Sequence, residues 1–418
     1  MYNGVAIEKL GTPVVVLVNT GFVNDAHSAA SGKGLPGVRI VPEPVLCESN
    51  IAEDIESGIA SVTDDIVAGL TRPLTAGEIS PQKETENLSR LVFKGSLQEV
   101  NRFFYRRGWT DGLPIIPPTE EAVNEMLAGT DLPADYVVAK VIPRLGKATV
   151  EKIAVNAVMA GCLPTYMPVL IAAVQALMEP KSRFDTFEVS TGSWSPFWAV
   201  NGPVRNDILI NGSSGSLSPG NIANAAIGRA VGLIVKNIGG ARKAIEDMGV
   251  IGNPGKYTLV IGEDEEESPW APLHVERGFQ KADSTVTVFF PNSFMQSIPL
   301  ETNADGILNA LAAMGAMPLS GFILNPTWAK ILARADWNRQ KVIEYIAANT
   351  RPAAPPRPPL SPEDIMLIVA GGPGAFMALL RSAGGFNNTF VTRKIQLPGN
   401  WPKLVTKYKN LAPAYVRY

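Results

Sequence analysis

The stretch PVVVLVNTG at residues 13–21 decides the fold of the N-terminal segment. A run of β-branched residues of this length predicts a strand buried on both faces, as in parallel sheets. FVNDAHSAASGKG (22–34) predicts a helix that closes on glycine, and GVRIVPEP (37–44) predicts a second strand. In IAEDIESGIASVTDDIVAGL (51–70) apolar residues recur at helical spacing. The expected order is therefore β-α-β-α.

Two strands cannot supply the neighbours that a buried parallel sheet needs on its edges, and sheets this small are marginal alone. We therefore expect an incomplete flavodoxin-like or Rossmann-like α/β segment that a second protein subunit completes. A larger α+β domain follows it. The overall fold class is α/β.

The remaining boundaries come from composition. Residues 1–72 form the partial α/β domain, and 73–128 are read as a polar linker and a connecting helix. The large domain is expected over 129–350, and a Pro-rich linker over 351–362. Residues 363–418 are read as a last module of strand, glycine loop, helix and strand.

The composition indicates a globular protein without a long-range electrostatic field. Of 418 residues, 46% are hydrophobic and 18% charged, and 37 Lys and Arg face 39 Asp and Glu. This balance argues against nucleic acid or a membrane surface as a partner. Two cysteines do not make a disulfide framework, and we see neither a signal peptide nor an apolar run of roughly 20 residues. We expect a cytoplasmic protein of bacterial type.

Each of the two cysteines has a chemical and a packing interpretation. Cys162, in VMAGCLPTYMP, lies between two apolar helices. At the N-terminus of the second helix its pKa would fall and favour a thiolate nucleophile, but cysteine is also a common core residue. Cys47 follows the second strand, at the edge of an α/β sheet where ligands bind.

The string GEDEEESPWAPLH (262–274) places acids at the end of a strand. Glu263 and Glu266 with His274 are candidates for acid–base catalysis, or for a metal site. The alternative is a solvated charge run. Only two histidines occur in the chain, which excludes a His-rich metal site.

Two loops are candidates for ligand binding. NGSSGSLSPGNIANAAIGRA (211–230) enters a helix and offers Ser213, Asn221 and Arg229 to a carboxylate or phosphate, although a capped helix explains the pattern equally. Asp111 is a turn residue or a site acid on a rigid loop.

A second glycine loop lies in IMLIVAGGPGAFMALL (365–380), read as strand, loop and helix. Gly371, Gly372 and Gly374 would let an anionic cofactor approach backbone N–H groups, or they simply form a tight turn. No specific cofactor is implied.

Several strings resemble a known family. Residues 5–44 resemble the second half of the UGSC family, which is named for a selenocysteine- or cysteine-Gly-Ser-Cys motif. The large region resembles the domain that accompanies it in bacterial proteins, through GWTDGLPIIPPTEE, NAVMAGCLP, PGNIANAAIGRAVGL, PGKYTLVIGEDEEESPWAPLHVERGF and VAGGPG.

The motif that names the family does not occur in this chain. The resemblance therefore implies that a separate subunit carries the first half of the domain with its thiol or selenol. It also implies redox or nucleophilic sulfur chemistry at a shared site.

The leading hypothesis is a subunit of a hetero-oligomeric enzyme, an oxidoreductase or lyase, that acts on a small anionic molecule. In it, Arg229 and the Asn221 loop hold the anion, Glu263 or Glu266 with His274 moves protons, and Cys162 or a partner thiol reacts. The alternatives are a metal-assisted lyase or hydrolase that uses the acidic cluster, and a non-catalytic scaffold subunit.

Overall fold

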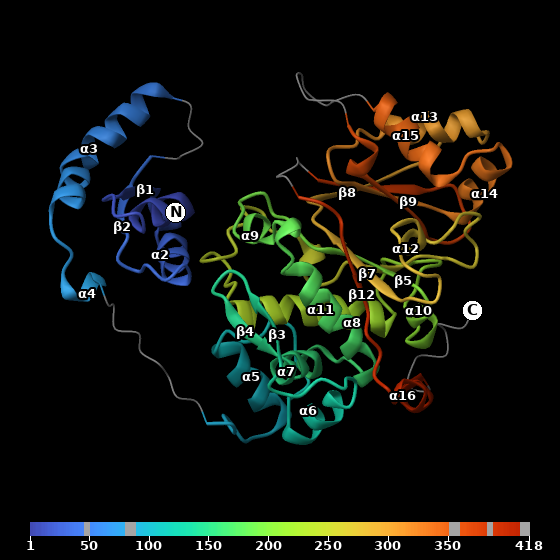
Figure 1. Cartoon of the computed structure of the whole chain (residues 1–418), viewed down its shortest axis with the longest axis horizontal. Helices are drawn as coiled ribbons and strands as arrows, with labels where there is room; N and C mark the ends of the chain where they lie inside the picture. The colour runs from blue at the N-terminus through green and yellow to red at the C-terminus, as the bar shows by residue number, and fades with distance from the viewer. Residues whose placement is uncertain (46–50, 80–88, 351–359, 383–387, 410–418) are drawn as a thin grey trace.

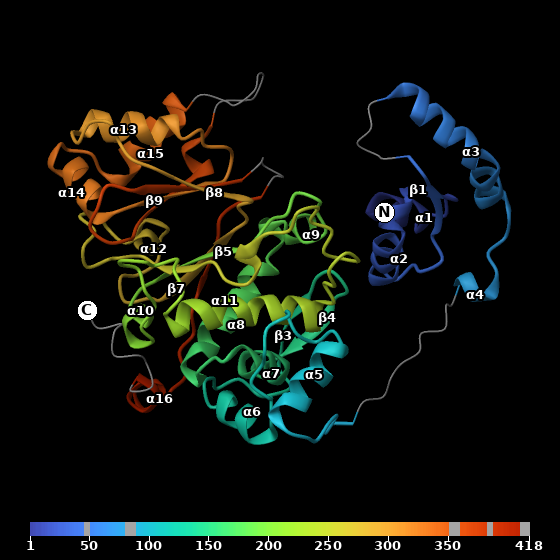
Figure 2. The same ribbon diagram turned by 180° about the vertical axis from the view of Figure 1, so that it is seen from behind.

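The computed structural model describes residues 1–45, 51–79, 89–350, 360–382 and 388–409. Figure 1 shows a small N-terminal unit beside a larger body, and the mixed α/β class predicted from the sequence is confirmed. Figure 2 shows the same two parts from behind.

The N-terminal unit has the predicted β-α-β-α order. Strands β1 (Val15–Asn19) and β2 (Arg39–Glu43) pair in parallel. Helix α2 (Val23–Gly32) lies between them in sequence, and α3 (Ala52–Thr71) follows β2. The structure adds an N-terminal helix, α1 (Tyr2–Glu8), and a short α4 (Ala76–Ile79).

This unit covers little of its own apolar surface. Leu17, in the middle of β1, is 40% exposed, although the sequence pattern predicts a strand buried on both faces. In α3 only Gly58 and Val62 are buried, whereas Ile55 and Ile59 are exposed. The described residues therefore do not supply the covering layer that the pattern demands.

The large body is a four-layer sandwich in which two sheets pack face to face between two layers of helices (Figure 1). The first sheet has the order β12-β7-β5-β6 and the second β10-β9-β11-β8. The strands of these two sheets are β5 (Phe197–Asn201), β6 (Val260–Gly262), β7 (Thr285–Phe289), β8 (Ser293–Ser297), β9 (Ser320–Leu324), β10 (Ile365–Val369), β11 (Met377–Arg381) and β12 (Val391–Lys394).

Apolar side chains from the two sheets meet in one core, where Phe197 and Phe289 of the first sheet share a cluster with Ile368 of the second. One helical layer covers the first sheet and the other covers the second. The first layer is α7 (Val150–Ala160), α8 (Met167–Leu177) and α11 (Ile222–Ile234); the second is α13 (Ala304–Ala313), α14 (Pro326–Arg334) and α15 (Arg339–Asn349).

A connecting helix is present within residues 73–128, as the sequence predicts. Helix α5 (Leu97–Arg106) begins at a capping box in which Ser96 and Glu99 satisfy each other's backbone N–H groups. The remaining elements are the hairpin β3 (Val137–Val141) and β4 (Gly146–Thr149), with α6 (Glu120–Leu127), α9 (Phe184–Phe187), α10 (Val204–Asp207), α12 (Leu273–Glu276) and α16 (Trp401–Tyr408).

The helix predicted after the second glycine loop is wrong. Residues Met377–Arg381 form β11, which pairs antiparallel with β8 and β9. A short apolar run fits a buried strand as well as a helix, and here the pairing of two neighbours decides. Strands β10 and β11 belong to the second sheet, and β12 belongs to the first. The expected C-terminal module is therefore part of the same two sheets as the large domain. Most of the Pro-rich linker lies outside the described residues.

Within the described ranges, no helix combines the length and the apolar character needed to cross a bilayer.

Gly202 and Gly278 offer a matched test of close packing. Both have left-handed backbones, with φ of 85° and 88°. A Cβ on Gly202 would lie 2.1 Å from the Asp283 carbonyl oxygen, whereas nothing lies within 4 Å of one on Gly278. We expect Gly278→Ala to cost about 1–2 kcal/mol, the strain of the backbone alone. Gly202→Ala should cost a further ~1–3 kcal/mol. Urea unfolding curves measure both, and equal midpoints would contradict the packing described here.

Candidate functional site

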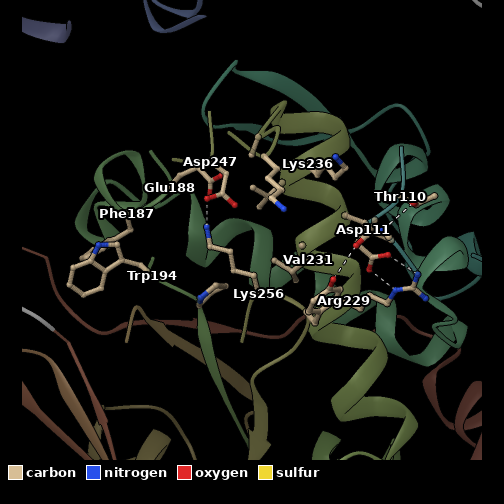
Figure 3. Close-up of a pocket in the computed structure, with 18 of the residues that line it drawn as sticks. Thr110, Asp111, Phe187, Glu188, Trp194, Arg229, Val231, Lys236, Asp247 and Lys256 are labelled. Carbon is tan, nitrogen blue, oxygen red and sulfur yellow. Dashed lines mark hydrogen bonds and ion pairs between the residues drawn. The ribbon is translucent and has the colours of Figure 1, made fainter. Parts of the chain in front are cut away.

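A cavity of about 410 Å³ lies where the C-terminal half of α11 meets the segment 184–196 and the loop 241–257 (Figure 3). Helix α11 continues into a π-helical turn, Val235–Gly239, and both pieces contribute to one wall. The residues of this cavity that matter below are Asp111, Phe184, Phe187, Glu188, Trp194, Arg229, Lys236, Lys243, Asp247, Lys256 and Phe290.

One wall of the cavity is aromatic. The Phe187 ring stacks on Phe290 with centroids 4.6 Å apart and meets the edge of Trp194 at 5.0 Å. Phe184 stacks on the other side of Phe290 at 5.6 Å. The indole N–H of Trp194 donates to the Ser190 hydroxyl at 3.0 Å, which fixes its orientation. This rigid surface suits an apolar portion of a ligand.

Two ion pairs border the cavity. Arg229 donates from Nε to Asp111 Oδ2 at 2.7 Å and from a terminal nitrogen to Oδ1 at 3.0 Å. Lys256 Nζ lies 2.6 Å from Asp247 Oδ1 (Figure 3). Each pair is partly shielded from solvent, which strengthens its attraction relative to a surface pair.

Glu188 lines the same cavity and is almost fully buried. Burial raises the pKa of its carboxyl group to about 8, Lys256 opposes this rise, and Asp247 and Glu246 add to it. The carboxyl group is therefore mostly protonated at neutral pH. A neutral carboxylic acid beside a ligand cavity can donate a proton or a hydrogen bond.

Lys236 sits on the π-helical turn and is half-buried against the cavity. Burial lowers the pKa of its amine, while Asp111 and Arg242 act on it in opposite directions. In the part of the chain that the structure describes, its amine has neither a hydrogen bond nor an ion pair. Figure 3 shows Lys236 between the carboxylates of Glu188 and Asp247 and that of Asp111.

The structure joins some of the predicted binding residues and separates others. Asp111 and Arg229, far apart in sequence, lie together at the cavity. Asn221 caps the opposite end of α11, eight residues from Arg229, which is about 12 Å along a helix. Arg229 and Asn221 therefore lie toward opposite ends of the helix, and the binding of one anion by Arg229 and the Asn221 loop stays a prediction.

Ser213 and Asn221 both bond to Asn211: the Ser213 backbone N–H donates to Asn211 Oδ1 at 2.9 Å, and the Asn211 amide donates to Asn221 Oδ1 at 3.3 Å. The residues that follow Ser213 line a different hollow of about 360 Å³. Gly371 donates its backbone N–H to the Gly212 carbonyl at 2.8 Å, and a Cβ on Gly372 would clash with Ser214. Gly371, Gly372 and Gly374 line this hollow, but no helix follows them. The helix N-terminus expected to attract an anion is thus absent from this loop.

Cys162 is a core residue. Its backbone N–H bonds to the Ala157 carbonyl across Gly161, which has a left-handed backbone, so the cysteine ends α7 rather than starting α8. The thiol donates to the Ala226 carbonyl at 3.4 Å, and burial raises its pKa well above the usual value. A protonated thiol away from the cavity is a poor nucleophile. Cys47 lies outside the described residues.

The acidic string is a structural ion network. Glu263 is fully buried, pairs with Arg339 of α15 and accepts the Leu273 backbone N–H at 2.7 Å. Glu266 pairs with Arg205 at 3.1 Å. These carboxylates tie the end of β6 to α15 and α10, and they lie outside the cavity at α11.

His274 is fully buried, with its Nδ1 3.7 Å from Glu265 Oε1, and among the described residues neither ring nitrogen has a hydrogen-bond partner. It does not line the cavity that Arg229 borders. Among the described residues, no group of three or more His, Cys, Asp or Glu side chains is arranged to hold a metal ion.

A family model matches residues 1–72, and its description is UGSC family. The N-terminal unit is a UGSC family domain. No curated protein and no solved structure matches the chain.

The UGSC domain contacts the loop 241–257 through α2. The Ser28 hydroxyl donates to Glu246 Oε1 at 2.8 Å, and Glu246 also pairs with Arg242. Burial and the nearby Glu246 raise the pKa of Asp25, also on α2, to about 6. Glu246 precedes Asp247 of the cavity, so the two parts of the chain meet beside the candidate site.

Sequence reasoning missed Glu188, Lys236, Lys256 and Asp247. Glu188 and Lys236 lie outside the quoted strings. Asp247 and Lys256 share the loop 241–257, and Lys256 stands in a string quoted for the family resemblance without having been singled out there. The one available signal for Lys236 was its position in an otherwise apolar helix pattern, IANAAIGRAVGLIVKNIGG, where a lone lysine interrupts a buried face.

Glu188→Gln tests the buried acid through the pH dependence of stability. The carboxyl pKa rises from 4.5 in the unfolded chain to about 8 in the folded protein. Because the carboxyl pKa is higher in the folded protein than in the unfolded chain, stability is greatest below pH 4.5. It falls as the pH rises from 4.5 toward about 8. We expect wild type and variant to melt together near pH 4.5, and the variant to be more stable by up to a few kcal/mol at pH 9. Differential scanning calorimetry measures this trend.

Glu267→Gln is the matched control, because Glu267 is exposed and pairs with the exposed Lys330. An exposed ion pair contributes little to stability, so this substitution should change the melting temperature only slightly. A melting-temperature difference for Glu188→Gln that stays constant from pH 5 to pH 9 would show that the carboxyl titrates normally.

Proposed function

We propose that this chain is a subunit of a hetero-oligomeric enzyme that acts on a small anionic molecule in the cavity beside α11. One observation carries the proposal: a protonated carboxyl group, an amine without a partner and a rigid aromatic surface line the same cavity. Groups whose pKa values are moved toward neutrality in a ligand-sized cavity are a mark of catalytic sites.

The charges favour an anion. Four cationic side chains line the cavity: Arg229, Lys236, Lys243 and Lys256. With Glu188 protonated, only Asp111 and Asp247 oppose them, and each is already paired with one of the cations. The surplus positive charge comes from Lys236 and the exposed Lys243, so a carboxylate or phosphate would be attracted to their side.

Glu188 and Lys236 supply acid–base chemistry. Glu188 donates a proton to a leaving or developing oxyanion, because its carboxyl group is neutral at the pH of the reaction. Lys236 accepts a proton or attacks an electrophile more readily than an ordinary lysine. Arg229 positions the loop of Asp111 and closes the cavity on the α5 side.

The sulfur chemistry implied by the family resemblance would come from outside the large domain. Cys162 is sealed in the core and carries a proton. The UGSC domain contacts Glu246, the residue before Asp247 of the cavity, so a thiol or selenol on a subunit that completes this domain would approach the cavity from that side.

The assembly proposal rests on exposed apolar surface. Leu17 of β1 and the row of Ile55, Ile59, Val67 and Leu70 on α3 face solvent in the described structure. An isolated two-stranded parallel sheet with such a helix is not a stable unit. A second subunit that adds strands to the sheet and covers α3 would satisfy the open sheet edges and bury the exposed apolar side chains.

Of the alternatives, a metal-assisted lyase has less support, because Glu263 and Glu266 are engaged by Arg339 and Arg205. A scaffold role does not explain an unpartnered lysine and a neutral acid in one cavity.

Trp194 provides a direct readout of ligand binding. We expect pyruvate, benzoate or inorganic phosphate to quench its fluorescence, with Trp194→Phe losing the signal. Lys236→Met should weaken the binding about tenfold, the effect of removing one charge-assisted contact. Lys330→Met, which removes an exposed lysine far from the cavity, should not change it. Absence of binding by all three anions to the assembled protein would refute the anion site.

The assembly is tested by co-expression with the protein encoded beside this one. We expect Ile55→Asp with Ile59→Asp to abolish co-purification and leave the far-ultraviolet circular dichroism of the chain unchanged, because both side chains are exposed in it. Glu56→Gln on the same helix is the matched control. Full stability and activity of the chain by itself would overturn the assembly proposal.

A further inference from the structure

We infer that the Lys236 amine forms an imine with the carbonyl carbon of a 2-oxo acid bound in this cavity. The inference deepens the proposed function and rests on it, because it requires that the cavity beside α11 bind an anionic ligand. It names the substrate class and the residue that bonds to it.

The first support is the contrast between the lysines of the cavity. Lys256 is held by Asp247 at 2.6 Å, and Lys243 is exposed at the rim. Lys236 is half-buried, and within the described ranges its amine has no hydrogen-bond or ion-pair partner. Burying a cationic amine without a partner is costly, so such a residue either becomes neutral or meets a ligand.

The backbone fixes the position of Lys236. It lies on the π-helical turn Val235–Gly239, a feature that often marks functional sites. Asn237 anchors the turn by donating to the Trp109 carbonyl at 3.0 Å and to Asn156 at 2.8 Å. A Cβ on Gly239 would lie 2.3 Å from the Ile142 carbonyl oxygen, so the turn packs directly on the β3–β4 hairpin. The amine is thus presented from a rigid support.

The electrostatics favour a nucleophilic amine. Burial lowers the pKa of Lys236 and Arg242 acts in the same direction, while the carboxylates of Asp111, Asp247 and Glu246 oppose them without reversing the net shift. Burial against apolar surface and a nearby cation are the two devices that make lysines reactive toward carbonyl groups. Only the neutral fraction of the amine attacks, so both effects increase the rate at neutral pH.

The step balances with groups that the cavity provides. The neutral amine adds to the carbonyl carbon, and the proton moves from nitrogen to oxygen to give a carbinolamine. The carboxyl group of Glu188 protonates the departing hydroxyl, the C–O bond breaks, and water leaves. The products are a protonated imine, a Glu188 carboxylate and one water molecule. The reverse sequence, hydrolysis, restores the amine, so no oxidant or reductant is needed.

The cavity selects the substrate class. A carboxylate next to the carbonyl group is attracted by the surplus positive charge around Lys236 and Lys243. An apolar side chain then contacts the aromatic surface of Phe187, Trp194 and Phe290. A 2-oxo acid with an apolar side chain combines all three features and fits within about 410 Å³.

The experiment traps the imine. The assembled protein is incubated with phenylpyruvate and sodium cyanoborohydride at neutral pH, and the modified peptide is identified by mass spectrometry. We expect one covalent adduct per chain, on Lys236. Lys236→Met and Lys236→Arg should abolish the adduct. Lys330→Met, which removes an exposed lysine outside the cavity, should retain it, and Glu188→Gln should slow its formation about tenfold or more.

The outcomes separate the two proposals. Adducts on Lys243 or spread over surface lysines would overturn the imine. Quenching of Trp194 by phenylpyruvate without any adduct would also overturn it, while leaving the anion site intact. Loss of both quenching and adduct formation in wild type would refute the proposed function itself.

Discussion

The close contact between α11 and the chain segment before β6 underlies both the fold and the candidate site. A Cβ on Gly228 would lie 2.3 Å from the Thr258 hydroxyl oxygen and 2.7 Å from its Cα, and one on Gly232 would lie 3.0 Å from the Lys256 carbonyl oxygen. Only glycine permits this approach. It brings α11 onto the first sheet and sets Lys256 beside the residues that follow the helix.

Much of the fold could be predicted from the sequence, where periodicity is strong. The parallel pair β1–β2 and the helices α3, α8 and α13 follow from local pattern. The two packed sheets could not be predicted, because each mixes strands distant in sequence, such as β12 with β7. Strand β11 was predicted as a helix for a related reason. Its short apolar run fits a helix or a strand, and only its pairing with β8 and β9 decides between them.

The candidate site was predictable only in part, because it also depends on contacts between residues that are distant in sequence. Asp111 and Arg229 were found because each stands in a conspicuous loop or helix, and the structure pairs them. The acidic string was a candidate because it holds many carboxylates in a few residues. In the structure, Glu263 forms a buried ion pair with Arg339. Glu188 and Lys236 carry no local signal. Their chemistry arises from burial, which is a property of the folded chain.

The contact between Ser28 and Glu246 has a consequence for the dynamics of the protein. The UGSC domain and the large domain belong to one chain, so their encounter is intramolecular, and the effective concentration of one at the surface of the other is on the order of millimolar. A small contact can hold the domain at such a concentration and still release it quickly. Here it includes this hydrogen bond and the approach of Gly32 to Pro143, where an added Cβ would lie 3.2 Å from the carbonyl oxygen. The wall of the cavity that contains Asp247 would then exchange between a covered and an uncovered form without dissociation of any subunit.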